Sequence, residues 1–299
     1  MSETMERSAL PPVRAPGGDG TQADEGTTAR GAPALAPEER KKAREAGTLD
    51  AKTTYEVIRE EGEKELARAP RALAWSGLAA GLSMGLSMVA EGVLRAHLPD
   101  APWRPLVSKL GYSVGFLAVI LGSQQLFTEN TLTPVVPYLS SKSGVPLRRV
   151  LRLWGIVFVT NILGTLLFAL AAAHTALFRP EVRDAFAAIG TEALAGSFGA
   201  TFVRAIGAGW LIALMVWMLP DARYARLPVI VIMTWLIGAA GLSHIIAGST
   251  EVLYTTATGA VPWSAYVTDF MLPTLAGNVL GGTGLVAALN HAQVVAGSE

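Results

Sequence analysis

Six long stretches of this sequence contain no Asp, Glu, Lys or Arg, and this pattern limits the fold more than any other feature. The stretches are 72–90, 110–128, 153–178, 205–220, 227–250 and 270–298. A bilayer core needs about 20 apolar residues in a helix. A content of 51% hydrophobic and 16% charged residues agrees with a lipid environment. We therefore predict an all-α membrane protein with six transmembrane helices.

An even number of spans places both termini on the same side of the membrane. If that side is the cytoplasm, it receives a small excess of basic residues, as the positive-inside rule favours. The cytoplasmic set is then Arg68, Arg71, Lys142, Arg148, Arg149, Arg152, Arg223 and Arg226, and the opposite set is Arg95, Arg104, Lys109, Arg179, Arg183 and Arg204. No apolar stretch precedes residue 71, so no signal peptide is expected. The sequence predicts a multi-pass protein of the inner (cytoplasmic) membrane with both termini in the cytoplasm.

The chain divides into three predicted segments. Residues 1–48 are rich in Pro, Gly, Ala and charge, which predicts a disordered cytoplasmic tail. Residues 49–70 contain Tyr55, Ile58 and Leu66 at helical spacing among Glu and Lys. This spacing predicts an amphipathic cytoplasmic helix at the membrane surface. Residues 71–299 form the six-helix transmembrane channel domain.

Several classes of function lack their sequence signatures. A net charge of +0 without a basic cluster gives no electrostatic reason for nucleic-acid binding. The chain has no cysteine, and it lacks a nucleotide-binding loop, a His/carboxylate metal spacing and a nucleophile beside a base. We therefore expect no nucleic-acid partner, no cofactor, no metal site and no enzymatic activity.

Two of the predicted spans contain polar residues at membrane depth. The second carries Gly-Ser-Gln-Gln at 122–125 and continues to Glu129, and the fifth carries Ser243 and His244 followed by Gly-Ser-Thr-Glu at 248–251. We expect the helices to break near 124–129 and 248–251. Spans two and five occupy corresponding places in two halves of three spans, so the halves form an inverted repeat. Paired broken helices of this kind indicate a transport site.

The same residues resemble the formate/nitrite transporter family over about residues 54–290. The marks are the helix from Tyr55 to Ala67, Leu126-Phe127-Thr128, Asn161 and Gly164, Val216-Trp217-Met218, Ser243-His244-Ile245-Ile246-Ala247, Pro273 and Gly277-Asn278. The resemblance implies an aquaporin-like protomer, a homopentamer in the lipid bilayer, and one pore per protomer for formate, nitrite or similar weak-acid anions.

His244 is the main candidate site residue. An ionisable ring inside an uncharged run is costly and usually functional, and in the resembling family this position is the central pore histidine. We expect His244 to face the pore, to donate a hydrogen bond to a passing anion or to give it a proton. Thr128 matches the threonine that faces this histidine, and its hydroxyl can donate to the anion, fix the imidazole tautomer or cap the following helix.

The resemblance also implies two apolar constrictions. Leu126, Phe127 and Ile237 match the cytoplasmic-side constriction, and Tyr112, Phe116 and Ile212 match the periplasmic-side one. Such apolar rings exclude hydrated ions and leave a dry chamber between them.

Some expected polar residues of the family are missing. Ala193 stands where many members carry a lysine, and Gly209 and Gly248 stand where they carry pore asparagines. Lys109 and Arg204, near the outer ends of their spans, are candidates to attract the anion in place of that lysine. The departures leave two other functions open: a channel for a neutral small solute, and a non-conducting membrane scaffold or sensor.

Overall fold

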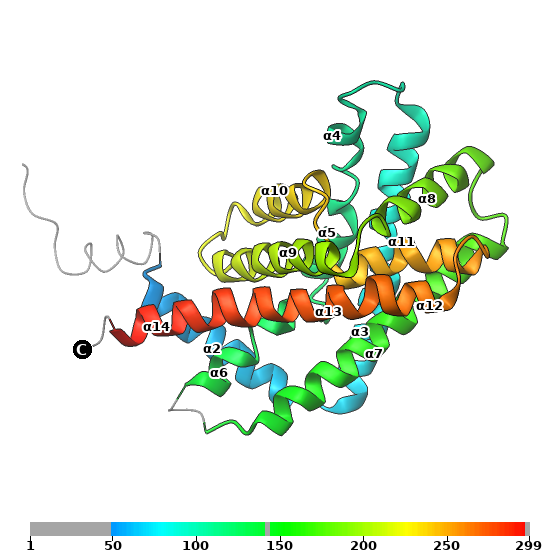
Figure 1. Cartoon of the computed structure of the whole chain (residues 1–299). Coiled ribbons are helices and arrows are strands. Elements are labelled where there is room, and N and C mark those ends of the chain that lie inside the picture. The colour runs from blue at the N-terminus through cyan, green and yellow to red at the C-terminus, as the bar shows by residue number, and fades with distance from the viewer. Residues whose placement is uncertain (1–48, 141–143, 297–299) are drawn as a thin grey trace, which may run out of the picture. The chain divides into compact units, whose positions relative to one another are not determined.

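The computed structural model describes residues 49–140 and 144–296, and all regular structure in these ranges is helical. Figure 1 shows the helices of this part of the chain packed side by side. The tail predicted over residues 1–48 lies outside the described residues.

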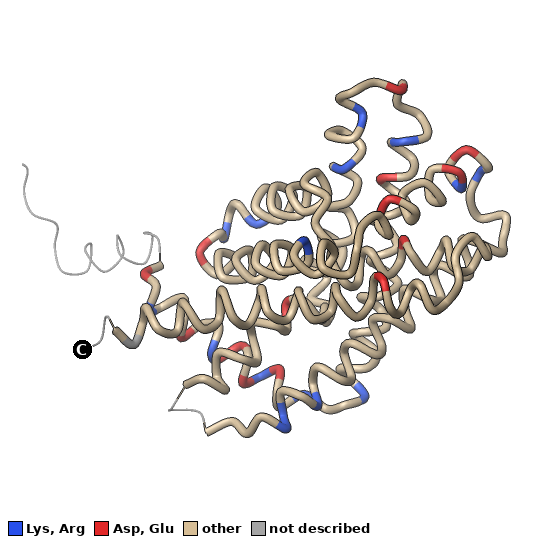
Figure 2. Tube along the Cα trace, in the orientation of Figure 1, with Lys and Arg blue, Asp and Glu red and all other residues tan. Residues whose placement is uncertain are grey.

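Five helical stretches are long and apolar enough to cross a membrane. They are Pro70–His97, Arg104–Leu121, Leu147–His174, Phe198–Met218 and Trp263–Val294. A shorter apolar helix, α10 (Arg226–Ala239), and α11 (Ile245–Ala257) together form the remaining span. Figure 2 shows that the charged residues gather toward helix ends and loops and leave long uncharged stretches between them. The described residues therefore contain the six predicted spans. Some helices begin well before the uncharged run that predicted them: α7 (Leu147–His174) begins before Arg152, and α9 (Phe198–Met218) begins before Arg204.

Span two is broken where the sequence predicted it. Its first half consists of α4 (Arg104–Ser108) and α5 (Ser113–Leu121), and its second half of η1 (Glu129–Thr131) and α6 (Val135–Leu139). The backbone between Leu121 and Glu129 is irregular. This agrees with the predicted break near 124–129.

Span five is also broken, but the predicted position of the break was wrong. The interruption lies between Ala239 and Ile245, whereas Gly248 to Glu251 form the second turn of α11. The chain turns at Gly241, whose φ of +64° suits glycine. Ser249 and Thr250 stay helical because their hydroxyls find partners within the protein, at Tyr266 and at the carbonyl of Ile246.

Glycines bring two pairs of spans into close contact. In α3 (Pro70–His97), a side chain at Gly81 would collide with Gly164 of α7 (Leu147–His174). In the last span, a side chain at Gly281 would collide with the backbone of α9 (Phe198–Met218) at Ile206. Span one therefore packs on span three as span four packs on span six, which is the arrangement of two equivalent halves.

The last span is one long helical run with irregular turns. It comprises α12 (Trp263–Ala265), the π-helical η2 (Tyr266–Met271), α13 (Leu272–Val279), the π-helical η3 (Leu280–Ala288) and α14 (Leu289–Ala296). Two further helices complete the described fold. Helix α2 (Ala51–Ala67) lies within the predicted segment 49–70, whereas α8 (Pro180–Ala193), which joins spans three and four, was not predicted.

Helix α2 packs on the protein through the face that the sequence marks as apolar. Tyr55, Ile58 and Leu66 are buried. The Tyr55 hydroxyl lies 2.7 Å from Nδ1 of His291 in α14, and Arg152 of α7 donates to the Leu66 carbonyl at 2.9 Å. The apolar face of α2 is thus covered by other helices of the same chain.

Candidate functional site

The two breaks have the same backbone geometry. Helix α5 ends in a turn in which Gln124 N donates to Val119 O, with Ser123 at φ +50°. Helix α10 ends in the equivalent turn, in which Leu242 N donates to Ile237 O, with Gly241 at φ +64°. Ser123 and Gly241 differ by 118 positions, and the hydrogen-bonded pairs of the two turns differ by the same number. Each helix therefore stops in the same way, and residues 118 positions apart are equivalent.

One asparagine holds the extended backbone of each break. Asn161 of α7 accepts from Phe127 N at 2.9 Å and donates to Gln125 O at 2.9 Å and Gly77 O at 2.7 Å. Its side chain satisfies backbone groups that the interrupted helix leaves unpaired, which a membrane interior requires. It also ties span three to spans one and two.

Asn278 of α13 does the same in the other half. It accepts from Ile245 N at 2.8 Å and donates to Ser243 O at 2.9 Å and Ala205 O at 2.8 Å. We call Asn161 and Asn278 the two clamp asparagines.

The breaks meet at Thr128 and His244. Thr128 Oγ1 lies 2.7 Å from Nε2 of His244, and the two side chains are 0% and 1% exposed. The structure thus brings together the two residues that the sequence singled out for the centre of a pore.

The hydrogen bonds of His244 identify its tautomer. Nδ1 accepts from the backbone N–H groups of Ile246 and Ala247 at 3.3 and 3.2 Å, so that His244 caps the N-terminus of α11. A backbone N–H can only donate, so Nδ1 carries no proton. Nε2 then carries the proton of the neutral ring and donates it to Thr128 Oγ1. The hydroxyl hydrogen of Thr128 remains available to another acceptor.

This arrangement favours a neutral imidazole. Protonation of Nδ1 would break both capping bonds and place a cation at the positive end of the α11 dipole. The expectation that His244 itself gives a proton to an anion is therefore not supported by its hydrogen bonds.

Two of the predicted outer constriction residues, Tyr112 and Phe116, form an aromatic row that reaches His244. The Phe116 and His244 rings are 4.9 Å apart in an edge-to-face arrangement, and the Tyr112 and Phe116 rings are 5.4 Å apart. Ile212 of α9 is 0% exposed. The Phe116 ring gives His244 an apolar neighbour on the side of span two.

The predicted inner constriction is less compact. Leu126, Phe127 and Ile237 are all buried. The Phe127 ring packs edge-to-face on Phe158 of α7 at 5.2 Å. The residue after Ile237, Gly238, packs on Tyr112 and Lys109, so Ile237 lies at the level of the outer set.

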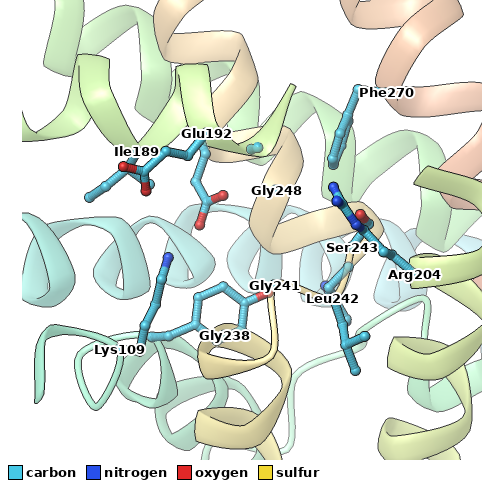
Figure 3. A pocket seen from close by; sticks show the side chains of 14 residues that line it. Lys109, Ile189, Glu192, Arg204, Gly238, Gly241, Leu242, Ser243, Gly248 and Phe270 are labelled. Carbon is cyan, nitrogen blue, oxygen red and sulfur yellow. The ribbon is translucent and has the colours of Figure 1, made fainter. Parts of the chain in front are cut away.

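A cavity of about 140 Å³ opens toward His244, and we call it the Lys109 cavity. Figure 3 shows Lys109 and Glu192 on one side of it and Arg204 and Phe270 on the other. The remaining lining residues come mainly from the break of span five and from α11: Tyr112, Ile189, Ala193, Gly238, Gly241, Leu242, Ser243, His244, Gly248 and Glu251.

The two basic residues predicted to attract an anion are both engaged within the protein. Lys109 Nζ forms an ion pair with Oε1 of Glu91 at 2.5 Å, and the Glu91 side chain is 0% exposed. Arg204 donates to the Ala195 carbonyl at 2.6 Å. Glu192, also in this cavity, is bound by Arg95 at 2.5 and 2.7 Å. The cavity is therefore lined by Lys109 and Arg204 together with Glu192 and Glu251, and it has no excess of positive charge.

A second cavity, of about 280 Å³, lies at the opposite ends of the same helices, and we call it the Arg226 cavity. Helix α5 reaches the Lys109 cavity near its start, at Tyr112, and the Arg226 cavity near its end, at Ile120; α9 does the same with Arg204 and Val216. The Arg226 cavity is lined by Val57, Glu61, Glu65, Ile120, Ser123, Gln124, Gln125, Glu129, Thr133, Val216, Leu219, Pro220 and Arg226.

Three carboxylates that the sequence did not single out as site residues lie in or beside these cavities. They are Glu91, Glu129 and Glu251, which stand directly after the uncharged runs that end at residues 90, 128 and 250. Glu129 and Glu251 were named only as polar residues of the two predicted breaks, and Glu91 was not named. The structure continues the helices beyond Glu91 and Glu251 and buries both side chains. For Glu91 and Glu251, the sequence signal was a single Glu followed by more apolar residues, which indicates that the helix continues past the charge.

The glycines at the two departures from the family pattern are packed closely. A side chain at Gly248 would collide with the ring of Phe270, and one at Gly209 would collide with the backbone of Asn278. Phe270 thus occupies the space beside Gly248 in the Lys109 cavity.

Comparison with known proteins points to one family. The family model for formate/nitrite transporters matches residues 52–292. Inner membrane protein YfdC of Escherichia coli (strain K12) is 46% identical over 240 residues, which cover 80% of this chain and 77% of that protein. Formate channel BtFdhC of Bacillus thuringiensis is 25% identical over 237 residues, covering 77% of this chain and 90% of that one.

Solved structures have the same fold. A pentameric formate channel with formate bound superposes with a TM-score of 0.64 at 21% identity, covering 76% of this chain and 100% of that one. An FNT family ion channel gives a TM-score of 0.69 at 18% identity, covering 80% and 98%. The predicted all-α membrane fold with broken spans two and five is confirmed by this likeness and by the helix boundaries.

Proposed function

Because the chain belongs to the formate/nitrite transporter family, we propose that it carries small monovalent weak-acid anions such as formate or nitrite across the membrane. The path runs from the Lys109 cavity past the Thr128–His244 contact to the Arg226 cavity. The contact of 2.7 Å between these two side chains carries the proposal, because it joins the two broken helices at the end of a cavity.

The chemistry at this contact suits a small acid or its anion. His244 donates to Thr128 Oγ1, and the Thr128 hydroxyl can then donate its own hydrogen to a carboxylate or nitrite oxygen. The neighbouring Phe116 ring is apolar and fully buried. A bare anion is costly in such surroundings, so a hydrogen-bond donor at the centre lowers the barrier to passage.

The orientation and assembly follow from the family and from the basic residues. The Arg226 cavity faces the cytoplasm, together with α2 and both termini, and the Lys109 cavity faces the other side of an inner membrane. The protein assembles as a homopentamer with one path in each protomer, as the pentameric formate channel of the same fold supports. The constriction residues keep their predicted roles, except that Ile237 belongs with Tyr112 and Phe116 on the outer side.

Flux measurements in liposomes test the proposal. Purified protein is reconstituted, and uptake of formate, nitrite, lactate and hydrosulfide is compared with that of protein-free liposomes. We expect saturable uptake of one or more of these species. Uptake of water or ammonia alone would favour the neutral-solute alternative, and no uptake of any solute would favour a scaffold or sensor.

A further inference from the structure

Glu251 lies on the same face of α11 as His244, with Gly248 between them, and all three line the Lys109 cavity. Residues at this spacing follow one another along one face of a helix. The collision that a side chain at Gly248 would make with Phe270 shows that the aromatic ring borders this face. Along this strip, Glu251 is the first ionisable group that a solute meets before His244.

The carboxyl group of Glu251 is buried and incompletely bonded. The side chain is 6% exposed, and Oε1 forms no hydrogen bond with any residue that the structure describes. The groups that face it come from several elements: Lys109 and Tyr112 from span two, Glu91 from α3, Glu192 from α8 and Arg204 from α9. Tyr266 of η2 is bonded to Ser249 instead.

The neighbours leave Glu251 without a cation of its own. Lys109 is paired with Glu91, and Arg204 is bonded to a backbone carbonyl. Glu192, outside the spans, is different: the bound guanidinium of Arg95 lowers the pKa of that carboxyl, so it remains ionised at neutral pH. An unpaired carboxylate inside a span is costly, and binding a proton removes that cost.

The Arg226 cavity contains a comparable group. Glu129 lines it, and Oε1 of Glu129 is buried without a hydrogen-bond partner among the described residues. The charged groups that face it are Glu61 and Glu65 of α2 and Arg226 of α10. By the separation of 118 positions, Glu129 corresponds to Ala247, one helical turn before Glu251. Each cavity is therefore lined by a carboxyl group with a buried, unbonded oxygen, and by this correspondence Glu129 and Glu251 lie on the same face of the two second half-helices.

We propose that Glu251 and Glu129 are proton-exchange groups that convert the weak-acid anion into the neutral acid at one cavity and reverse the reaction at the other. The inference rests on the proposed function and adds a coupled proton to it. At Glu251 the carboxyl O–H bond breaks and an O–H bond forms on the anion, leaving a carboxylate that water in the cavity reprotonates. At Glu129 the acid returns its proton to the carboxylate, which releases it to water.

This exchange explains how the path works without an excess of positive charge. The species that passes Phe116 and the neutral His244 is uncharged, so it pays no charge-desolvation cost there. One anion and one proton cross together, and the net movement carries no charge.

The test combines charge movement in the wild-type protein with glutamine variants. Proteoliposomes with an internal pH dye receive a formate gradient at several external pH values, with and without an imposed membrane potential. We expect formate and protons to enter together at a rate that the potential does not change. An electrogenic formate current in the wild-type protein would overturn the proposal without any variant.

Glu251→Gln and Glu129→Gln keep the shape of the side chain and remove its proton exchange. We expect each to lower the coupled flux at least about tenfold and to flatten its dependence on external pH. Glu181→Gln, at an exposed position in the first turn of α8 that lines neither cavity, serves as the matched control and keeps the profile. Wild-type rates and pH profiles in both variants would refute the proposal while leaving the proposed function standing.

An infrared measurement distinguishes a failure of the proton-exchange proposal from a failure of the proposed transport function. The stretching band of a protonated carboxyl group is recorded in wild-type protein as pH is changed, and again in Glu251→Gln. We expect a band that titrates in the wild type and is lost in the variant. If the wild-type protein conducts no weak acid, the proposed function fails. The infrared result is independent of that outcome: if no carboxyl band titrates in the wild-type protein, Glu251 does not exchange a proton, whether or not the protein conducts.

Discussion

In span two the helix stops at Leu121 and the residue at the centre of the break is Leu126, whereas in span five it stops at Ala239 and the central residue is His244. Leu126 and His244 are equivalent by the separation of 118 positions that relates the two turns. The turns and the clamp asparagines are shared by both breaks, while the imidazole is present in only one. The shared backbone is thus a structural requirement of a broken span, and the chemistry lies in the residue by which the halves differ.

The largest expected effect concerns what the two halves share. Asn161→Leu and Asn278→Leu keep the branched outline of the side chain in a somewhat larger volume. Each removes two hydrogen bonds to a break and a third to a neighbouring span. Each should destabilise the protein by about 3 kcal/mol or more, because backbone groups inside the membrane lose their partners. Thermal loss of monodisperse protein in detergent measures the effect. A variant pair in which only one loses stability would show that the clamps are not equivalent.

A smaller effect is expected at the left-handed turn residues. Gly241→Ala should cost about 1–2 kcal/mol, and this cost is conformational because a side chain there meets no atom within 4 Å. Ser123→Ala is the matched control, since Ser123 at φ +50° already bears this cost. The same thermal assay compares them. If the two variants lose the same amount of stability, Gly241 does not share the left-handed conformation of Ser123, and the two turns are not equivalent.

The smallest effect concerns the residue by which the halves differ. His244→Asn retains an acceptor that can cap α11, whereas His244→Phe does not. The Phe variant should be less stable than the Asn variant by about 1 kcal/mol. If thermal unfolding finds the two equally stable, Nδ1 does not cap the helix, and the assignment of the neutral tautomer is wrong.

Much of the fold could be predicted from the sequence because lipid imposes a simple rule on composition. Six uncharged runs gave six spans, and polar residues within two of them indicated broken helices. The break of span five was placed too late because Gly-Ser-Thr at 248–250 reads as irregular, although these residues are helical in α11. Local composition does not show that tertiary partners accept their hydroxyl groups.

The candidate site was predictable only where its residue types are rare. His244 stands out as an ionisable residue in an uncharged run, and Thr128 came from the family resemblance. The engagement of Lys109 by Glu91 could not be predicted, because the two residues lie on different spans and meet only after the spans pack together. The same holds for the capping role of Nδ1, which depends on where α11 begins.

Formate uptake by Thr128→Val proteoliposomes tests the central claim most directly. Valine preserves the shape of threonine and removes the hydroxyl that His244 orients at the meeting point of the two breaks. Thr165→Val, at a buried threonine of α7 that lines neither cavity, is the matched control for the loss of a buried hydroxyl group. The account predicts that Thr128→Val lowers formate uptake at least about tenfold, the loss expected for one hydrogen bond of about 1.4 kcal/mol, while Thr165→Val retains most of it. Uptake by Thr128→Val at the wild-type rate would contradict the claim that the path runs past the contact between Thr128 and His244.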